Sequence, residues 1–235
     1  AYRPSASAYQ PSDLLVRNDE RRYELMLPSI LQNKTRFCAL LYRHDTPQRS
    51  RIFHELRAYK PVDALGKLFR EIASPPGHLL DGHDHLQTYD YLDGSVKWYE
   101  PYKFVVVAET WSRHGYVTEK IINCMLANAV PIYWGPREVV KHFNPAAIIF
   151  VDFDSNEWLE RVKQIDNDPR LFEAMLGQPW FLPSSWGLFY LFNYTQVMAP
   201  PLLALVRLRV ASAPIEIDDV VDLSASTPTS ASASD

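Results

Sequence analysis

The chain has 235 residues, of which 47% are hydrophobic and 13% aromatic, so it is long enough to bury the core of one large or two small domains. Its net charge of −4 combines a basic N-terminal part, with eleven Lys and Arg against six Asp and Glu in residues 1–60, with an acidic C-terminal tail. This distribution suits an anionic small ligand but lacks the dense basic clusters of nucleic-acid-binding proteins, so we expect no nucleic-acid partner.

The two ends of the chain have the composition of mobile segments. Residues 1–12 are rich in Pro, Ser and Ala, and residues 211–235 end in a Ser-Ala-rich acidic run. Cys38 and Cys124 lie in apolar runs, which predicts buried thiols and no disulfide framework. No N-terminal hydrophobic segment resembles a signal peptide or anchor, and no apolar run reaches the ~18 residues of a membrane span. We therefore expect a soluble, cytoplasmic protein.

Apolar runs of strand length alternate with helical patterns between these ends. We predict strands at residues 36–42, 103–108, 130–134 and 147–151, and helices at 48–59, 118–129 and after an N-cap at Ser155. Residues 71–100 are rich in turns and stay unassigned, and residues 180–194 are expected to pack back on the sheet. Because the connections are too long for hairpins, the pattern predicts an α/β fold with a Rossmann-like parallel sheet and helices on both faces.

The loop at residues 109–118 follows the second predicted strand and leads into a helix, which is where ligands bind in open parallel sheets. Gly115 permits a tight turn, and Thr118 can cap the helix while free N–H groups face an anion. Lys120 opposes the helix dipole in the first turn, which favours an anionic ligand such as a diphosphate. Glu119 can accept hydrogen bonds from sugar or ribose hydroxyls. A capped helix with a solvated Glu-Lys pair explains the same spacing.

Several motifs occur in order along residues 36–153. They are Gly115-Tyr116-Val117-Thr118-Glu119-Lys120-Ile121, Val130-Pro131-Ile132-Tyr133-Trp134-Gly135-Pro136, Phe143-Asn144-Pro145 and Ile149-Phe150-Val151-Asp152-Phe153. Upstream stand Arg36-Phe37-Cys38-Ala39, Pro47, Arg49, Phe53, Leu56, Tyr59-Lys60 and Val62-Asp63. This order and spacing resemble the C-terminal half of the α-1,3/1,4-fucosyltransferase family.

The resemblance implies the donor-binding half of a GT-B glycosyltransferase. Such an enzyme transfers fucose from GDP-fucose to a hydroxyl of a glycan or glycoprotein, with inversion and with no metal or other cofactor. It also implies that Arg49 and Lys120 contact the diphosphate and that Tyr116 and Glu119 contact the sugar or ribose. The complete predicted donor-binding set is Arg49, Glu109, Thr110, Gly115, Tyr116, Thr118, Glu119 and Lys120.

The sequence departs from the family pattern beside the donor. Thr110-Trp111 stands where the family has Asn-Ser, and Lys67-Leu68-Phe69-Arg70 replaces an Asn-rich segment. These differences leave open a different donor, such as a UDP-pentose.

A GT-B enzyme also has an N-terminal acceptor domain, and only 35 residues precede Arg36 here. We expect a reduced or missing acceptor domain at residues 1–35, a donor-binding domain at 36–195 and a C-terminal segment at 196–235. No residue stands out as the general base, for which the candidate carboxylates are Asp13, Asp19, Glu20, Glu24 and Glu109. A non-catalytic nucleotide-sugar or glycan-binding module is therefore the alternative from another class.

Two clusters have residue types that could bind a metal ion. Asp152-Phe153-Asp154 follows a strand, as does the metal-binding Asp-x-Asp of a different glycosyltransferase fold. The second cluster is Asp81, His83, Asp84 and His85. The family pattern makes the first an ordinary strand end, and the second is a polar turn, so we predict no metal site.

Other features leave two interpretations each. His114 could donate to a phosphate oxygen or be merely exposed, and Trp111 or Tyr133 could stack on a sugar or base or belong to the core. The sequence has no P-loop, no Gly-x-Gly-x-x-Gly and no Ser-His-Asp elbow, so kinase, dehydrogenase and hydrolase functions lack support.

Overall fold

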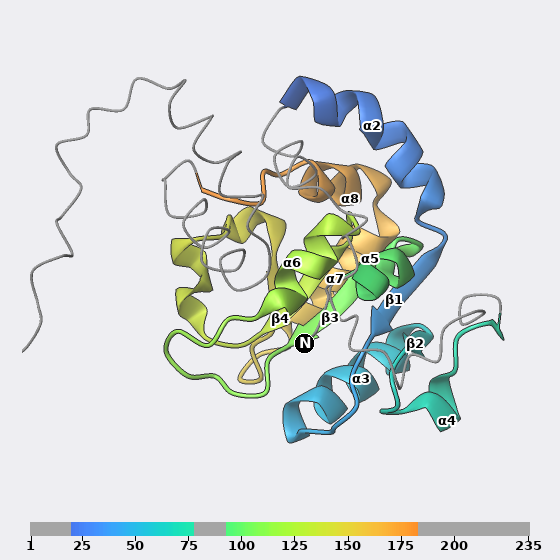
Figure 1. Cartoon of the computed structure of the whole chain (residues 1–235), viewed down its shortest axis with the longest axis vertical. Coiled ribbons are helices and arrows are strands. Elements are labelled where there is room, and N and C mark those ends of the chain that lie inside the picture. Colours follow the sequence, from blue (N-terminus) through green and yellow to red (C-terminus); the bar gives the residue numbers. More distant parts are fainter. Residues whose placement is uncertain (1–19, 78–92, 183–235) are drawn as a thin grey trace, which may run out of the picture.

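The computed structural model describes residues 20–77 and 93–182, in which five parallel strands form one sheet (Figure 1). The strands are β1 (Arg36–Leu40), β2 (Val62–Ala64), β3 (Tyr102–Ala108), β4 (Val130–Trp134) and β5 (Ile149–Phe150). Their order across the sheet is β2-β1-β3-β4-β5, and each neighbouring pair is parallel. The α/β class and the parallel sheet predicted from the sequence are confirmed.

Helices cover both faces of this sheet. They are α2 (Glu20–Asn33), α3 (Pro47–Tyr59), α4 (Arg70–Ala73), α5 (Asp93–Tyr99), α6 (Glu119–Leu126), α7 (Glu157–Asn167) and α8 (Pro169–Leu176), with the 3₁₀ turns η2 (Arg137–Lys141) and η3 (Pro145–Ala147). Side chains of α3, α7 and α8 share one hydrophobic cluster, and those of α5 and α6 share another. The sheet therefore separates two cores.

Strand β3 shows why the strands read as unbroken apolar runs. Phe104, Val106 and Ala108 point into the cluster with α3 and α7, whereas Val105 and Val107 point into the cluster with α5 and α6. All five residues are buried. A strand covered on both faces has no polar side, so the alternation seen in half-exposed strands is lost.

Some predicted boundaries need correction. Helix α6 ends at Leu126 rather than at residue 129, because Asn128 has a φ of 53° and this left-handed conformation ends the helix. Strand β5 is shorter than residues 147–151, since η3 occupies 145–147. The N-cap position of α7 is held by Asn156 rather than Ser155. Helix α8 was not predicted, although Asp168 caps it through the N–H of Arg170.

Helix α2 begins before the predicted domain boundary at residue 35 and packs on the sheet domain. Ile30 belongs to the cluster shared with α3 and α7. Just after the helix, Lys34 Nζ donates to the carbonyls of Glu100 and Ala127, both at 2.7 Å. The division into three segments stays a prediction.

Other predictions concern residues beyond the described ranges. The two chain ends, the cluster from Asp81 to His85 and most of residues 180–194 lie there. Within the described ranges, Cys38 and Cys124 are buried thiols, as predicted. None of the helices in those ranges has the length and apolar character needed to cross a bilayer.

Candidate functional site

The predicted donor residues gather where the chain connections diverge. Strands β1 and β3 are neighbours, but the chain leaves β1 for α3 on one face and leaves β3 for α6 on the other. In α/β proteins ligands bind at such a divergence, in a crevice beyond the carboxyl ends of the two strands, and we call this region of the protein the crevice. Loop 109–118 and the first turn of α3 both lie at this edge.

Arg49 reaches this crevice from the first turn of α3. Thr46 caps that helix by accepting the Arg49 N–H at 3.2 Å, and Pro47 occupies the first turn. The guanidinium donates to the Ala108 carbonyl through Nε (3.3 Å) and Nη2 (3.1 Å), and to the His44 carbonyl at 2.9 Å. It also donates to Thr110 Oγ1 at 3.2 Å. Neutral oxygens thus orient the cation without cancelling its charge.

Arg49 is also buried without an acidic partner among the described side chains. The residue is only 6% exposed, and no carboxylate oxygen of a described side chain lies within 4.0 Å of its guanidinium. A buried charge is ordinarily paired with an opposite charge, so the Arg49 guanidinium is suited to bind an anionic ligand.

Tyr42 supports Arg49 and was not singled out from the sequence. Its ring centre lies 4.0 Å from the Arg49 guanidinium carbon. Its hydroxyl accepts from the Ala108 N–H at 2.6 Å and donates to the Val106 carbonyl at 2.9 Å. Burial raises the pKa of Tyr42 well above its ordinary value, so the phenol keeps the proton that it donates. The sequence marked Tyr42 only as a strand residue.

Glu109, Thr118, Glu119 and Lys120 form a second group on the other side of the crevice. The Thr118 N–H donates to Glu109 Oε1 at 2.8 Å, and Thr118 Oγ1 lies 2.9 and 2.8 Å from the two Glu109 oxygens. Lys120 Nζ lies 2.8 Å from Thr118 Oγ1 and 3.4 Å from Glu109 Oε2. Glu119 Oε1 is 3.6 Å from the same ammonium. This group therefore shares one cation between two acids.

Thr118 corrects one expectation from the sequence. It occupies the N-cap position of α6, but its side chain makes no capping hydrogen bond. The Thr118 hydroxyl is engaged with Glu109 instead. Spacing along the chain could not reveal this, because the competing acceptor lies nine residues away, across the loop.

The tip of the loop is attached to η2 through Glu138, which the sequence analysis did not select. Gly115 has a φ of 75°, and its N–H donates to Glu138 Oε1. His114 Nδ1 lies 3.0 Å from Glu138 Oε2, although the His114 side chain is 86% exposed. The Gly115 N–H, helped by His114, holds the pKa of Glu138 below its ordinary value. The carboxylate is therefore charged when it holds the tip.

The structure separates the two aromatic candidates. Tyr133 is 1% exposed and belongs to the core, whereas Trp111 is 53% exposed and carries the Arg113 guanidinium 4.7 Å from its ring centre. Tyr116 is also exposed, at 37%. The exposed tip thus offers Trp111 and Tyr116 to solvent, and neither joins the hydrogen-bonded group around Glu109.

The remaining candidate bases lie either outside the described residues or in helix α2. Asp13 and Asp19 lie outside the described ranges. Helix α2, in which Glu20 is the first residue, lies along the opposite edge of the sheet from loop 109–118 (Figure 1). Glu109 is at the correct edge, but its side chain has no exposed surface.

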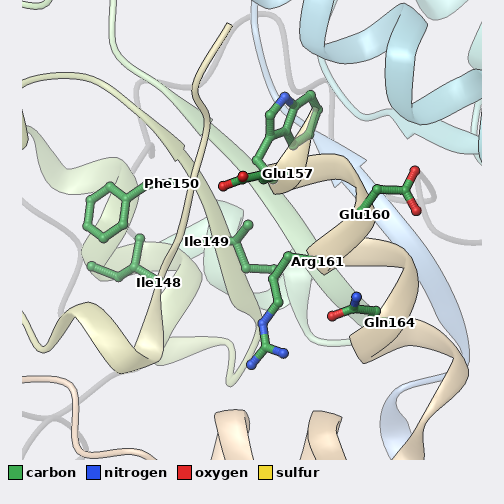
Figure 2. Close-up of a pocket in the computed structure, with 8 residues that line it drawn as sticks. Ile148, Ile149, Phe150, Glu157, Glu160, Arg161 and Gln164 are labelled. Carbon is green, nitrogen blue, oxygen red and sulfur yellow. The ribbon is translucent and has the colours of Figure 1, made fainter. Parts of the chain in front are cut away.

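Other potential ligand sites have different surroundings. In the described ranges no three His, Cys, Asp or Glu side chains are grouped to hold a metal ion. Asp152 accepts from the Asp154 N–H at 3.0 Å and faces Arg137 at 3.8 Å. A pocket of about 470 Å³ lies between β5 and α7, where Figure 2 shows Arg161 between Ile149 and Gln164. None of the predicted donor residues lines it.

Comparisons with known proteins show the family of the chain. Residues 31–176 match the family model described as glycosyltransferase family 10 (fucosyltransferase), C-terminal part. The chain is 34% identical over 172 residues to "Putative fucosyltransferase" of Acanthamoeba polyphaga mimivirus, covering 72% of this chain and 28% of that protein. It is 28% identical over 163 residues to alpha-(1,3)-fucosyltransferase FucT of Helicobacter pylori, covering 67% and 34%.

A solved structure shares the fold. The crystal structure of an alpha1,3-fucosyltransferase with GDP-fucose aligns with a TM-score of 0.52 and 25% identity. The alignment covers 66% of this chain and 42% of that one. The match to this chain thus spans less than half the length of each of these three proteins.

Proposed function

Because the chain belongs to glycosyltransferase family 10, the fucosyltransferases, we propose that the crevice between β1 and β3 binds the diphosphate of GDP-fucose. A similar alpha1,3-fucosyltransferase has been solved with GDP and with GDP-fucose, which supports this donor. The observation that carries the proposal is Arg49, a cation that is 6% exposed and held by carbonyl oxygens at the ligand-binding edge of the sheet.

The proposed reaction transfers fucose to a hydroxyl of a glycan with inversion. The bond between the anomeric carbon and the β-phosphate oxygen breaks, the acceptor oxygen forms the new bond, and the acceptor's proton passes to a base. GDP leaves with added negative charge on its β-phosphate. Arg49 and Lys120 are two positive charges positioned in advance to stabilise that charge, and such preorganisation lowers the barrier to transfer.

Glu109 belongs to the donor side in this proposal and is not the base. Its carboxylate is fully buried and already accepts hydrogen bonds from Thr118. A general base must lie within hydrogen-bond reach of the hydroxyl that it deprotonates. Tyr116 and Glu119, both in or beside the loop, are proposed to contact the sugar or ribose.

A panel of nucleotide sugars tests this function. We expect GDP and GDP-fucose to raise the melting temperature, and UDP-xylose to have no effect. Release of GDP in the presence of fucose acceptors would then report transfer. Stabilisation by UDP-xylose alone would contradict the assigned donor, a possibility motivated by Thr110-Trp111 in place of Asn-Ser. Binding of GDP-fucose without any transfer would favour a non-catalytic binding module.

The same assay tests the absence of a metal requirement. In the proposal the diphosphate charge is met by Arg49 and Lys120, so EDTA should leave the transfer rate unchanged. A rate that EDTA abolishes and Mg²⁺ or Mn²⁺ restores would instead assign the diphosphate to a metal ion.

A further inference from the structure

The hydroxyl of Thr118 has a defined direction of hydrogen bonding. An ammonium group only donates, so Lys120 Nζ must donate to Thr118 Oγ1 across their 2.8 Å separation. The hydroxyl has a single proton, which is then directed to the Glu109 carboxylate at 2.8–2.9 Å. The three side chains form a chain of donors, Lys120 to Thr118 to Glu109, that ends on an acid.

Glu109 is held rigidly at the end of this chain. Its N–H donates to the Trp134 carbonyl at 2.9 Å, which continues the pairing of β3 with β4. Gly135 packs against it so closely that a Cβ atom there would lie 3.0 Å from Glu109 Cγ. The side chain has no exposed surface. A carboxylate fixed in this way provides a stationary acceptor for the two more exposed residues.

We infer that Glu109 is a positioning residue for the Lys120 ammonium and acts through the Thr118 hydroxyl. By accepting a hydrogen bond from the Thr118 hydroxyl, Glu109 turns that hydroxyl away from the first turn of α6 and directs its oxygen toward Lys120. A lysine side chain has four rotatable bonds, so an ammonium without this support would sample many positions. The inference deepens the proposed function and rests on it, because it concerns how the same cation is aimed at the diphosphate.

A purely electrostatic role for Glu109 makes the opposite prediction. If the carboxylate merely neutralised Lys120 from 3.4 Å, its removal would free positive charge and strengthen anion binding. If it positions Lys120, its removal weakens binding. In Glu109→Gln one of the two acceptor oxygens becomes an amide nitrogen that only donates. A single oxygen is then left for the N–H and the hydroxyl of Thr118, or the amide faces the Lys120 ammonium donor to donor. The sign of the change therefore separates the two roles.

The variants Thr118→Val, Thr118→Ser and Glu109→Gln test the inference by calorimetry with GDP and with inorganic pyrophosphate. Thr118→Val removes the hydroxyl without changing charge, and we expect it to weaken both ligands about tenfold. Thr118→Ser should retain the wild-type affinity, and Glu109→Gln should weaken binding. In a Lys120→Met background, Thr118→Val should have no further effect, because coupled residues are not additive.

A matched control is Asp63→Asn. Asp63 is another buried acid, bound by Arg36 Nε at 2.6 Å and by the Tyr102 hydroxyl at 2.8 Å, away from the crevice. The Asp63→Asn substitution should lower the melting temperature and leave the affinity for GDP unchanged. Unchanged GDP affinity in Thr118→Val, tighter binding in Glu109→Gln, or additive effects in the Lys120→Met background would each overturn the inference.

The two probes keep this inference separate from the proposed function. Wild-type binding of pyrophosphate without binding of GDP would contradict the assigned donor, while the variants still report on Glu109 through pyrophosphate. Wild-type binding of neither ligand would contradict both.

Discussion

The two edges of the sheet use charge in different ways. At the amino ends of the strands, Asp166 is buried and accepts from Lys60, from Lys103 at 3.0 Å and from the Tyr59 hydroxyl at 3.0 Å. At the carboxyl ends, Arg49 is oriented by carbonyl oxygens, and Lys120 shares Glu109 and Glu119. The charges paired around Asp166 hold elements together, whereas Arg49, which is oriented by neutral groups, keeps its charge for a ligand.

The largest expected effect belongs to the amino edge. Asp166→Asn removes the charged acceptor of three hydrogen bonds, from Lys60, Lys103 and the Tyr59 hydroxyl. A hydrogen bond to a charged group contributes about 1.5–3 kcal/mol, and because water can reach both lysines we expect a total loss of about 3 kcal/mol in the free energy of unfolding. Urea unfolding at pH 7 measures it. The affinity for GDP should not change. A parallel loss of affinity would contradict the assignment of Asp166 to stability and of the carboxyl edge to ligand binding.

The Asp166 cluster should also make stability depend on pH. Burial by itself would raise the pKa of Asp166, but hydrogen bonds from Lys60 and Lys103 outweigh burial and hold the pKa below its ordinary value. The folded state thus favours the ionised carboxylate, so the stabilisation is present above the unfolded pKa of about 3.9 and is lost as the pH falls through the lower, folded value. The difference between wild type and Asp166→Asn should shrink in this acid range.

The next largest effect concerns donor binding. Lys120→Ala removes one of the two cations at the crevice and should weaken GDP binding roughly 100-fold, about 2.7 kcal/mol, as expected for a hydrogen bond to a charged group. The melting temperature should fall as well, because the buried Glu109 carboxylate loses its cation partner. Lys163→Ala is the matched control, since Lys163 pairs with Glu160 on α7. Equal affinities in the two variants would show that Lys120 does not contact the diphosphate.

A smaller effect is expected when the charge of Arg49 is kept and its shape is changed. Arg49→Lys retains the cation but loses the paired contacts to the Ala108 carbonyl and the contact to Thr110. We expect about tenfold weaker GDP binding and a loss of about 1–2 kcal/mol in stability. The control Arg57→Lys, on the same helix but exposed, should leave the affinity unchanged. If Arg49→Lys bound GDP with wild-type affinity, the positive charge alone, and not the shape of the guanidinium, would account for binding.

The smallest effect concerns the attachment of the loop tip. Glu138→Gln weakens the acceptor of the Gly115 N–H, so the Gly115 amide should exchange faster with deuterium while GDP binding changes by less than about threefold. In wild type the Gly115 N–H and His114 hold the pKa of Glu138 below its ordinary value, so the attachment should persist until the pH falls through that lowered pKa. The variant should lack this acid dependence beyond the intrinsic exchange rate.

The two edges also differ in how well the sequence predicts them. The central strands could be predicted from the sequence because β3 and β4 are buried on both faces, so their residues form unbroken apolar runs. Loop 109–118 was readable because Gly115 and Lys120 have unusual positions relative to a strand and a helix. The Asp166 cluster was not predicted, since Lys60, Lys103 and Asp166 are ordinary charged residues in sequence and only the packing of α7 against the sheet brings them together.

The sequence by itself determined the alternation of strands and helices, the two-sided burial of the sheet and the family to which the chain belongs. These properties are local, because each is determined by the residue types in a short stretch of sequence. Only the tertiary structure decided the partners of those side chains: Tyr42 beneath Arg49, Glu138 on the Gly115 N–H, and Glu109 as the acceptor of the Thr118 hydroxyl. Hydrogen bonds depend on distance and direction in space, so a threonine placed to cap a helix bonded a buried acid across the loop instead.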